Sequence, residues 1–198
     1  MLGPPGERLL RAAARVADLL EQTASRPPQY GCSGLHEWAM VHRADDVRHA
    51  VPLRLGAAGT SAVVDRLPVR CSHFDAFRFF TGTARPLNAL QPTRETQRDL
   101  EQPGCLHANM DLYRAAYSLS PQVPAELVAD AFDLTRRIRV LDMRASPYDL
   151  VAYGLRPVRV ETTGGRAEYA AAQREFAEEA APLRARVLQT ARAVQAVA

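Results

Sequence analysis

Lysine is absent from this 198-residue chain, and all 25 of its basic residues are arginine. Isoleucine occurs once, at Ile138, whereas alanine, arginine, valine and leucine are abundant. A very GC-rich coding sequence produces this composition, so codon bias is the simpler explanation of the arginines. The alternative is a nucleic-acid partner, because arginine binds phosphates and the net charge is +3. The arginines are not clustered, and charge alone therefore selects no function.

Long apolar runs are missing as well. No run approaches the roughly 18 residues that a membrane-spanning helix needs, and residues 1–10 lack the basic start and apolar stretch of a secretory signal. The three cysteines, an odd number, are typical of reduced thiols rather than of a disulfide framework. We therefore expect a soluble, cytoplasmic protein with no membrane partner.

The chain also lacks a glycine-rich phosphate loop between a strand and a helix, which argues against the nucleotide-binding folds. Its length predicts one domain over residues 1–198 with a single hydrophobic core. This domain is expected to consist of an N-terminal helix within residues 1–27, a core that carries the cysteines and histidines at 28–163, and a C-terminal helix at 164–198.

Apolar residues at helical spacing predict the helices, and prolines mark their limits. Pro27 and Pro28 end the first helix, and Pro182 is expected to kink the last helix or to split it in two. Two further helices are predicted, at 108–118 and 124–138. Three short β-like stretches are predicted at 51–55, 69–73 and 158–161. The sequence therefore predicts an α+β fold, a helix-rich domain with a few short strands and a long C-terminal helix.

Each cysteine is closely followed by a histidine. Thiolate and imidazole are the side chains that bind borderline and soft metals, so the pairs predict a mononuclear zinc or iron site built from some of these residues. Zinc takes four ligands, fewer than the six available. In the alternative interpretation each cysteine is a small buried hydrophobe and each histidine is a hydrogen-bonded residue beside a turn. The candidate metal ligands are Cys32, His36, Cys71, His73, Cys105 and His107.

If these segments act together, their side chains must converge on one cleft. We therefore expect the second and third cysteine–histidine pairs, Cys71 with His73 and Cys105 with His107, to lie near each other.

Acidic residues follow the same histidines, and they suggest general acid–base chemistry. A carboxylate beside an imidazole can orient the ring or act as a base, with a pKa that burial adjusts. At least one of these acids is expected to be buried beside a histidine. Asp111 is the first candidate among these acids, because packing explains the HANMD string that contains it less well than the strings around the others. The candidate catalytic residues are Asp111, Glu37, Asp75, His36 and His107.

The segment 141–150, LDMRASPYDL, is a further candidate. Asp142 and Arg144 are expected to pair in a buried bidentate salt bridge, which would make the segment structural. A ligand-binding loop that uses Arg144 is the alternative.

Five further strings of the sequence are informative when they are taken together: GCSGLHEWAMVHR, VRCSHFDAFRFF, EQPGCLHANMDLYRAAY, LDMRASPYDL and GRAEYAAAQREF. They resemble a group of actinobacterial proteins commonly labelled 3-methyladenine DNA glycosylase. The similarity runs from about Pro28 to Arg184, and the chain resembles an N-terminally shortened member of the group.

This resemblance implies hydrolysis of the N-glycosidic bond of an alkylated purine, with double-stranded DNA as the partner. Such an enzyme flips the base into a pocket and uses a carboxylate to position water or to stabilise the cationic sugar. Trp38 or Tyr113 would stack on the base, and Asn109 and Arg144 would also bind the substrate.

The glycosylase is therefore the first hypothesis. A zinc- or iron-dependent enzyme that acts on a small molecule is the second and rests on the cysteine–histidine pairs. A binding protein without catalysis is the third.

Overall fold

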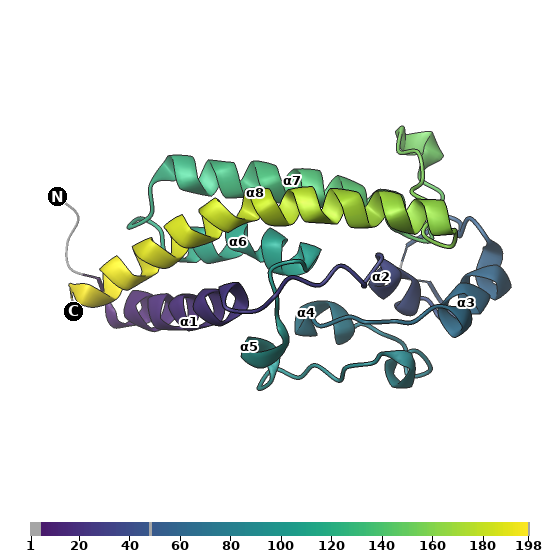
Figure 1. Cartoon of the computed structure of the whole chain (residues 1–198), viewed down its shortest axis with the longest axis horizontal. Coiled ribbons are helices and arrows are strands. Elements are labelled where there is room, and N and C mark those ends of the chain that lie inside the picture. The colour runs from purple at the N-terminus through teal and green to yellow at the C-terminus, as the bar shows by residue number, and fades with distance from the viewer. Residues whose placement is uncertain (1–4, 48, 198) are drawn as a thin grey trace.

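The computed structural model describes residues 5–47 and 49–197. About 60% of the chain is helical, only ~2% is extended, and the described residues form no sheet (Figure 1). The predicted α+β class is therefore wrong, and the chain is mostly all-α. The elements follow in the order α1 (Glu7–Ala24), α2 (Leu35–Ala39), α3 (Gly56–Arg66), α4 (Phe74–Phe77), η1 (Arg85–Leu87), α5 (Gln97–Leu100), α6 (Leu106–Ser118), α7 (Ala125–Ala145), η2 (Val151–Tyr153) and α8 (Thr163–Ala196).

Helices α1, α6, α7 and α8 pack against one another, and we call them the bundle (Figure 1). Their apolar stripes meet in a core that includes Leu20, Leu112, Leu134 and Val187. Burial of such side chains supplies most of the stabilisation of a helix in a folded protein. The bundle therefore forms the long frame of the molecule.

Helix α8 runs along nearly the whole length of the molecule. Its first turn is capped by the Thr162 hydroxyl, which accepts a hydrogen bond from the amide of Gly165 at 3.1 Å. A side chain at Gly165 would meet the carbonyl oxygen of Arg159 at 2.0 Å, so only glycine fits there. Pro182 lies inside α8 without splitting it, and the helix bends along its course (Figure 1).

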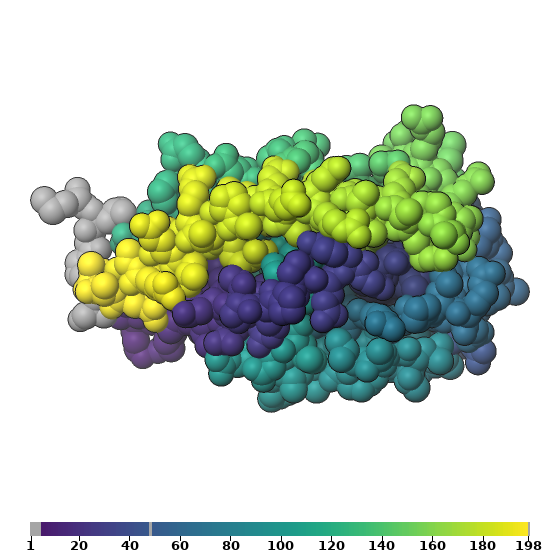
Figure 2. All heavy atoms as spheres, viewed as in Figure 1, coloured from purple at the N-terminus to yellow at the C-terminus, as the bar shows by residue number. Residues whose placement is uncertain are grey.

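The segment 25–105 forms the other part of the molecule, which we call the loop-rich half. It contains short helices joined by irregular chain and lies along one side of the bundle (Figure 1). The stretch that follows α1 fills the boundary between α8 and the rest of this half (Figure 2). It enters α2 through Ser33 and Gly34, which both have positive φ angles, of 51° and 72°.

The three predicted strands are not formed. Leu53 pairs with Tyr148 and Val69 with Asn88 only as isolated bridges. The stretch 158–161 has no bridge among the described residues, although Val158 and Val160 are fully buried. The alternation that resembled a strand therefore reflects burial of every second residue. No neighbouring extended segment of matching length is present to form a ladder with it.

Helix α7 is longer than predicted and continues to Ala145 instead of ending near Ile138. Ile138, Leu141, Asp142 and Ala145 are all buried, at the spacing of one helical face. The predicted end of this helix at residue 138 is therefore wrong. Among residues 5–47 and 49–197, no helix has the length and apolar character required to cross a membrane.

Candidate functional site

The most buried charged contact links α2 to α7. His36, in the first turn of α2, donates a hydrogen bond from Nε2 to Oδ1 of Asp142 at 2.8 Å. Both side chains are almost completely excluded from solvent. On the other edge of the ring, Nδ1 of His36 lies 3.3 Å from the Sγ atom of Cys32. The ring is therefore held between a thiol and a carboxylate.

This contact determines the charges of both partners. Burial alone would lower the pKa of His36, but the charge of Asp142 and the hydrogen bonds to Asp142 and Cys32 raise it well above its ordinary value. Burial alone would raise the pKa of Asp142, but His36 holds it below its ordinary value. The pair is therefore an imidazolium and a carboxylate.

Glu37 and Arg139 complete the outer side of this contact. Oε1 of Glu37 lies 4.0 Å from Nε2 of His36. Arg139 donates hydrogen bonds to Asp142 at 2.8 Å and to Glu37 at 3.4 Å. Burial and the negative charge of Asp142 raise the pKa of Glu37.

His107, in the first turn of α6, lies between the other two histidines of this region. Its ring centre is 4.5 Å from that of His36 and 5.2 Å from that of His73. Burial and the neighbouring positive charge of His36 lower the pKa of His107 well below its ordinary value. A neutral imidazole is the form that binds metal ions.

Four side chains therefore offer ligand atoms at one point. The ligand atoms of His36, Glu37, His107 and Asp142 all lie within 4.8 Å of one another, and we call these residues the His36 group. They come from α2, α6 and α7. Two imidazoles and two carboxylates match the ligand preferences of zinc, iron and manganese.

A second group lies beside the first and consists of His73, Glu101 and Asp111; we call it the His73 group. Its ligand atoms also lie within 4.8 Å of one another. Nε2 of His73 is 3.3 Å from Glu101 and 3.2 Å from Asp111. Burial raises the pKa of Glu101, although the charge of His73 opposes this effect.

A cavity of about 320 Å³ adjoins the His36 group. His36 and His107 form part of its wall, together with all three cysteines, Cys32, Cys71 and Cys105. The second and third cysteine–histidine pairs therefore lie near each other, as expected. Burial raises the pKa of Cys71 and of Cys105, so both are neutral thiols.

The structure places the thiols differently from the predicted mixed cysteine–histidine site. None of the three cysteines belongs to either of the two groups found among the described residues. The converging side chains are instead histidines and carboxylates. Of the acids expected beside a histidine, Glu37 and Asp111 lie there.

Asp75, the remaining candidate acid, is bound by arginines instead. Arg94 contacts it at 3.0 Å and Arg114 at 3.3 Å. Partial burial would raise the pKa of Asp75, but these two cations hold it below its ordinary value.

The four residues expected to bind substrate serve the fold or lie at the surface. Trp38 is fully buried and donates its indole hydrogen to the carbonyl of Ala145 at 2.8 Å. Tyr113 packs its ring against those of Tyr117 and Phe132.

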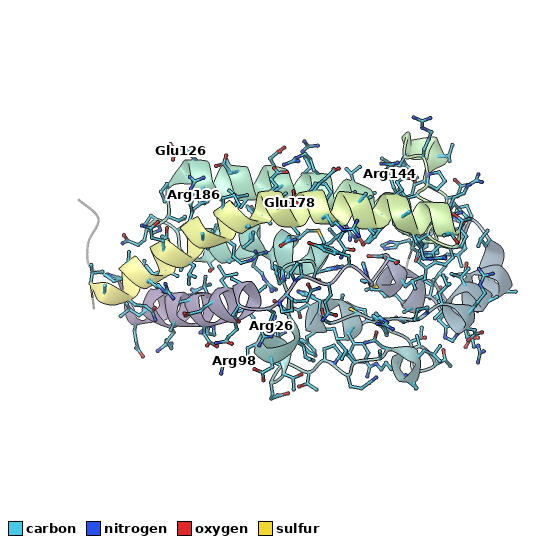
Figure 3. All side chains as sticks on the ribbon, in the orientation of Figure 1. Arg26, Arg98, Glu126, Arg144, Glu178 and Arg186 are labelled. Carbon is cyan, nitrogen blue, oxygen red and sulfur yellow. The ribbon has the colours of Figure 1, made fainter. Side chains whose placement is uncertain are left out.

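The other two are Asn109 and Arg144. Asn109 is fully buried and accepts a hydrogen bond from Arg184. Arg144 lies at the outside of the molecule (Figure 3), where it donates to the carbonyl of Arg156 and pairs with Glu168.

The predicted buried bridge between Asp142 and Arg144 is therefore wrong. Residues two positions apart on a helix point to different faces, whereas Arg139, three positions away, shares a face with Asp142. Asp142 binds His36 and Arg139 instead.

Sequence reasoning missed Asp142 and Glu101 as partners of histidines. A signal for Asp142 was present, because an acid occupies a position on the apolar face of α7 beside Ile138 and Leu141. Glu101 follows the four-residue helix α5 within irregular chain, and no periodic pattern marks it.

Comparison with known proteins identifies no relative: no family model, no curated protein and no solved structure matches this chain.

Proposed function

We propose that this protein is a metal-dependent enzyme that binds a zinc or iron ion at the His36 group and acts on a small molecule in the adjoining cavity. The observation that supports this most directly is the convergence of four ligand atoms, from His36, Glu37, His107 and Asp142, within 4.8 Å. Ligand bonds of about 2.0–2.2 Å place opposite ligand atoms no more than about 4.4 Å apart, so small side-chain adjustments bring all four to one ion.

Charge also favours a cation at this point. Two carboxylates, of Glu37 and Asp142, face each other in a buried region, and the partly exposed Arg139 reaches them from outside. Buried like charges are costly unless they are paired or bound to a metal. In the metal-free protein, the positive charge of protonated His36 compensates the negative charge of Asp142. Metal binding would release that proton.

The cavity supplies the place for a substrate. Its volume, about 320 Å³, is that of a small-molecule site, and its wall includes the polar side chains of Arg70, Gln102 and Gln173. A metal ion beside such a cavity lowers the pKa of a bound water and polarises a substrate oxygen. The proposed reaction class is therefore metal-assisted hydrolysis of a small polar molecule. The free thiols and the proposed metal suit the cytoplasm.

The glycosylase activity implied by the family resemblance stays a prediction. Its observable consequence is duplex-DNA binding that weakens strongly, by on the order of a hundredfold or more, between about 50 and 200 mM salt. Salt-insensitive or undetectable binding would count against it.

Metal analysis of purified protein tests the proposal. We expect reconstitution with Zn²⁺ or Fe²⁺ to load the His36 group. Asp142→Asn keeps the shape of the side chain and should weaken that binding by about a hundredfold or more, since even indirect partners of a ligand contribute 10–100-fold. Asp133→Asn, an exposed acid on the same helix, is the matched control and should bind as the wild type does. Metal binding unchanged in Asp142→Asn, or absent in the wild type, would overturn the proposal.

A further inference from the structure

The His73 group is not used by the function proposed above, yet it has the composition of a metal site. One imidazole and two carboxylates converge from three segments: His73 precedes α4, Glu101 follows α5, and Asp111 lies within α6. His73 and Glu101 are almost completely buried, whereas the Asp111 side chain is partly exposed.

The separations of these atoms match those of ligands around a common ion, and the His73–Asp111 contact is also within hydrogen-bond range. A charge-assisted hydrogen bond between an imidazole and a carboxylate is about 2.7–2.9 Å long. Nε2 of His73 is instead 3.3 Å from Glu101 and 3.2 Å from Asp111. Two ligands at about 2.0–2.1 Å from a tetrahedral ion are about 3.4 Å apart.

The charges around the group are arranged as they are around the His36 group. Arg114 binds Asp111 from the outside at 2.7 Å, three residues along α6. Arg139 binds Asp142 in the same way, three residues apart on α7. Each group thus has a pair of carboxylates with one arginine on its solvent side.

An ion would also have a route to this group. A second cavity, of about 460 Å³, lies between α1, α5 and α6 and is lined by Glu101, Asp111 and Arg114. Access from solvent is a requirement for any metal site. Glu101 and Asp111 are thus reachable from a side that the first cavity does not share.

We infer that His73, Glu101 and Asp111 hold a second divalent metal ion, which makes the site a two-metal centre with His107 between its halves. The inference deepens the proposed function and rests on it for the neighbouring ion. The ring of His107 lies 4.5 Å from that of His36 and 5.2 Å from that of His73, so it stands between the two groups. Paired ions stabilise the attacking and the leaving oxygen of a displacement at once, which suits hydrolysis of an ester or a phosphoester.

Counting the ions tests this inference. The full chain is titrated with Mn²⁺ and with Zn²⁺ by calorimetry, and bound metal is measured by mass spectrometry after gel filtration. We expect two ions per chain in the wild type and one in Glu101→Gln. Asp99→Asn, two residues away and exposed, is the control and should keep both. Asp111→Asn is the second variant if Glu101→Gln fails to fold.

The outcomes separate the two proposals. One ion in the wild type that Asp142→Asn removes and Glu101→Gln retains overturns the second site and leaves the proposed function intact. One ion that Glu101→Gln removes and Asp142→Asn retains supports an ion at the His73 group, but it overturns both the proposed function and the two-metal centre. No bound ion in the wild type overturns both. Two ions in both Glu101→Gln and Asp111→Asn also contradict the assignment made here. Spin coupling between two bound Mn²⁺ ions would support a shared centre.

Discussion

The bundle and the loop-rich half are stabilised in different ways. In the bundle, apolar side chains such as Leu112, Leu134 and Val187 fill the space between long helices, whose backbone hydrogen bonds are already satisfied. In the loop-rich half, buried irregular chain needs polar partners, and side chains such as Asn88 and Gln102 supply them.

Asn88 illustrates the second kind of stabilisation. Its side chain accepts a hydrogen bond from the amide of Cys71 at 2.7 Å and donates to the carbonyls of Cys71 and Leu90, at 2.9 and 2.6 Å. It thereby replaces a strand neighbour for the stretch that precedes His73. The bundle therefore depends on the packing of apolar side chains, whereas the site depends on individual polar contacts.

Truncation of the bundle core should have the largest effect on stability. Leu134 is fully buried on α7, and Leu134→Ala should lower the free energy of unfolding by about 2–5 kcal/mol, since it removes apolar contacts and leaves a cavity. Urea denaturation measures this loss. Arg136→Ala, an exposed neighbour, should change it by no more than about 0.5 kcal/mol. Equal effects of the two changes would show that α7 is not packed as described.

Removal of the Asn88 side chain should destabilise the loop-rich half more than the bundle. Asn88→Ala leaves three backbone groups unpaired, and we expect a loss of about 2–3 kcal/mol, because each buried polar group without a partner costs about 1–3 kcal/mol and some will bind water. Hydrogen exchange should rise around residues 69–91 and remain slow in α7. Uniform loss of protection over both parts would contradict the independence of the two halves.

The smallest effect is expected at the cavity wall. Cys105 is a buried neutral thiol outside both histidine–carboxylate groups, so Cys105→Ala should leave the number of bound metal ions unchanged and cost about 1 kcal/mol of stability. Metal analysis and urea denaturation test both parts. Loss of one ion would show that a thiolate is a ligand, as the cysteine–histidine pairs suggested.

The helices of the bundle were largely predictable, because a helical apolar stripe is a local property of the sequence. The pattern after Pro124 and the prolines at 27 and 28 gave correct helices to within a few residues, apart from the end of α7. The strands failed for the opposite reason. An extended stretch becomes a strand only when another segment pairs with it along its length. In the described structure residues 51–55 and 69–73 form only isolated bridges, and residues 158–161 form none.

The available chemistry follows from local sequence: three histidines, each close to a cysteine and an acid, lie in segments that the fold brings together. Which of these groups meet depends on long-range packing. Asp142 lies 106 positions from His36, and Glu101 is 28 positions from His73. Neither contact follows from a local period, because each depends on how α7 and the chain around α5 pack against the segments that carry the histidines. Local spacing thus predicted that the histidines converge, and long-range packing placed carboxylates rather than thiols around them.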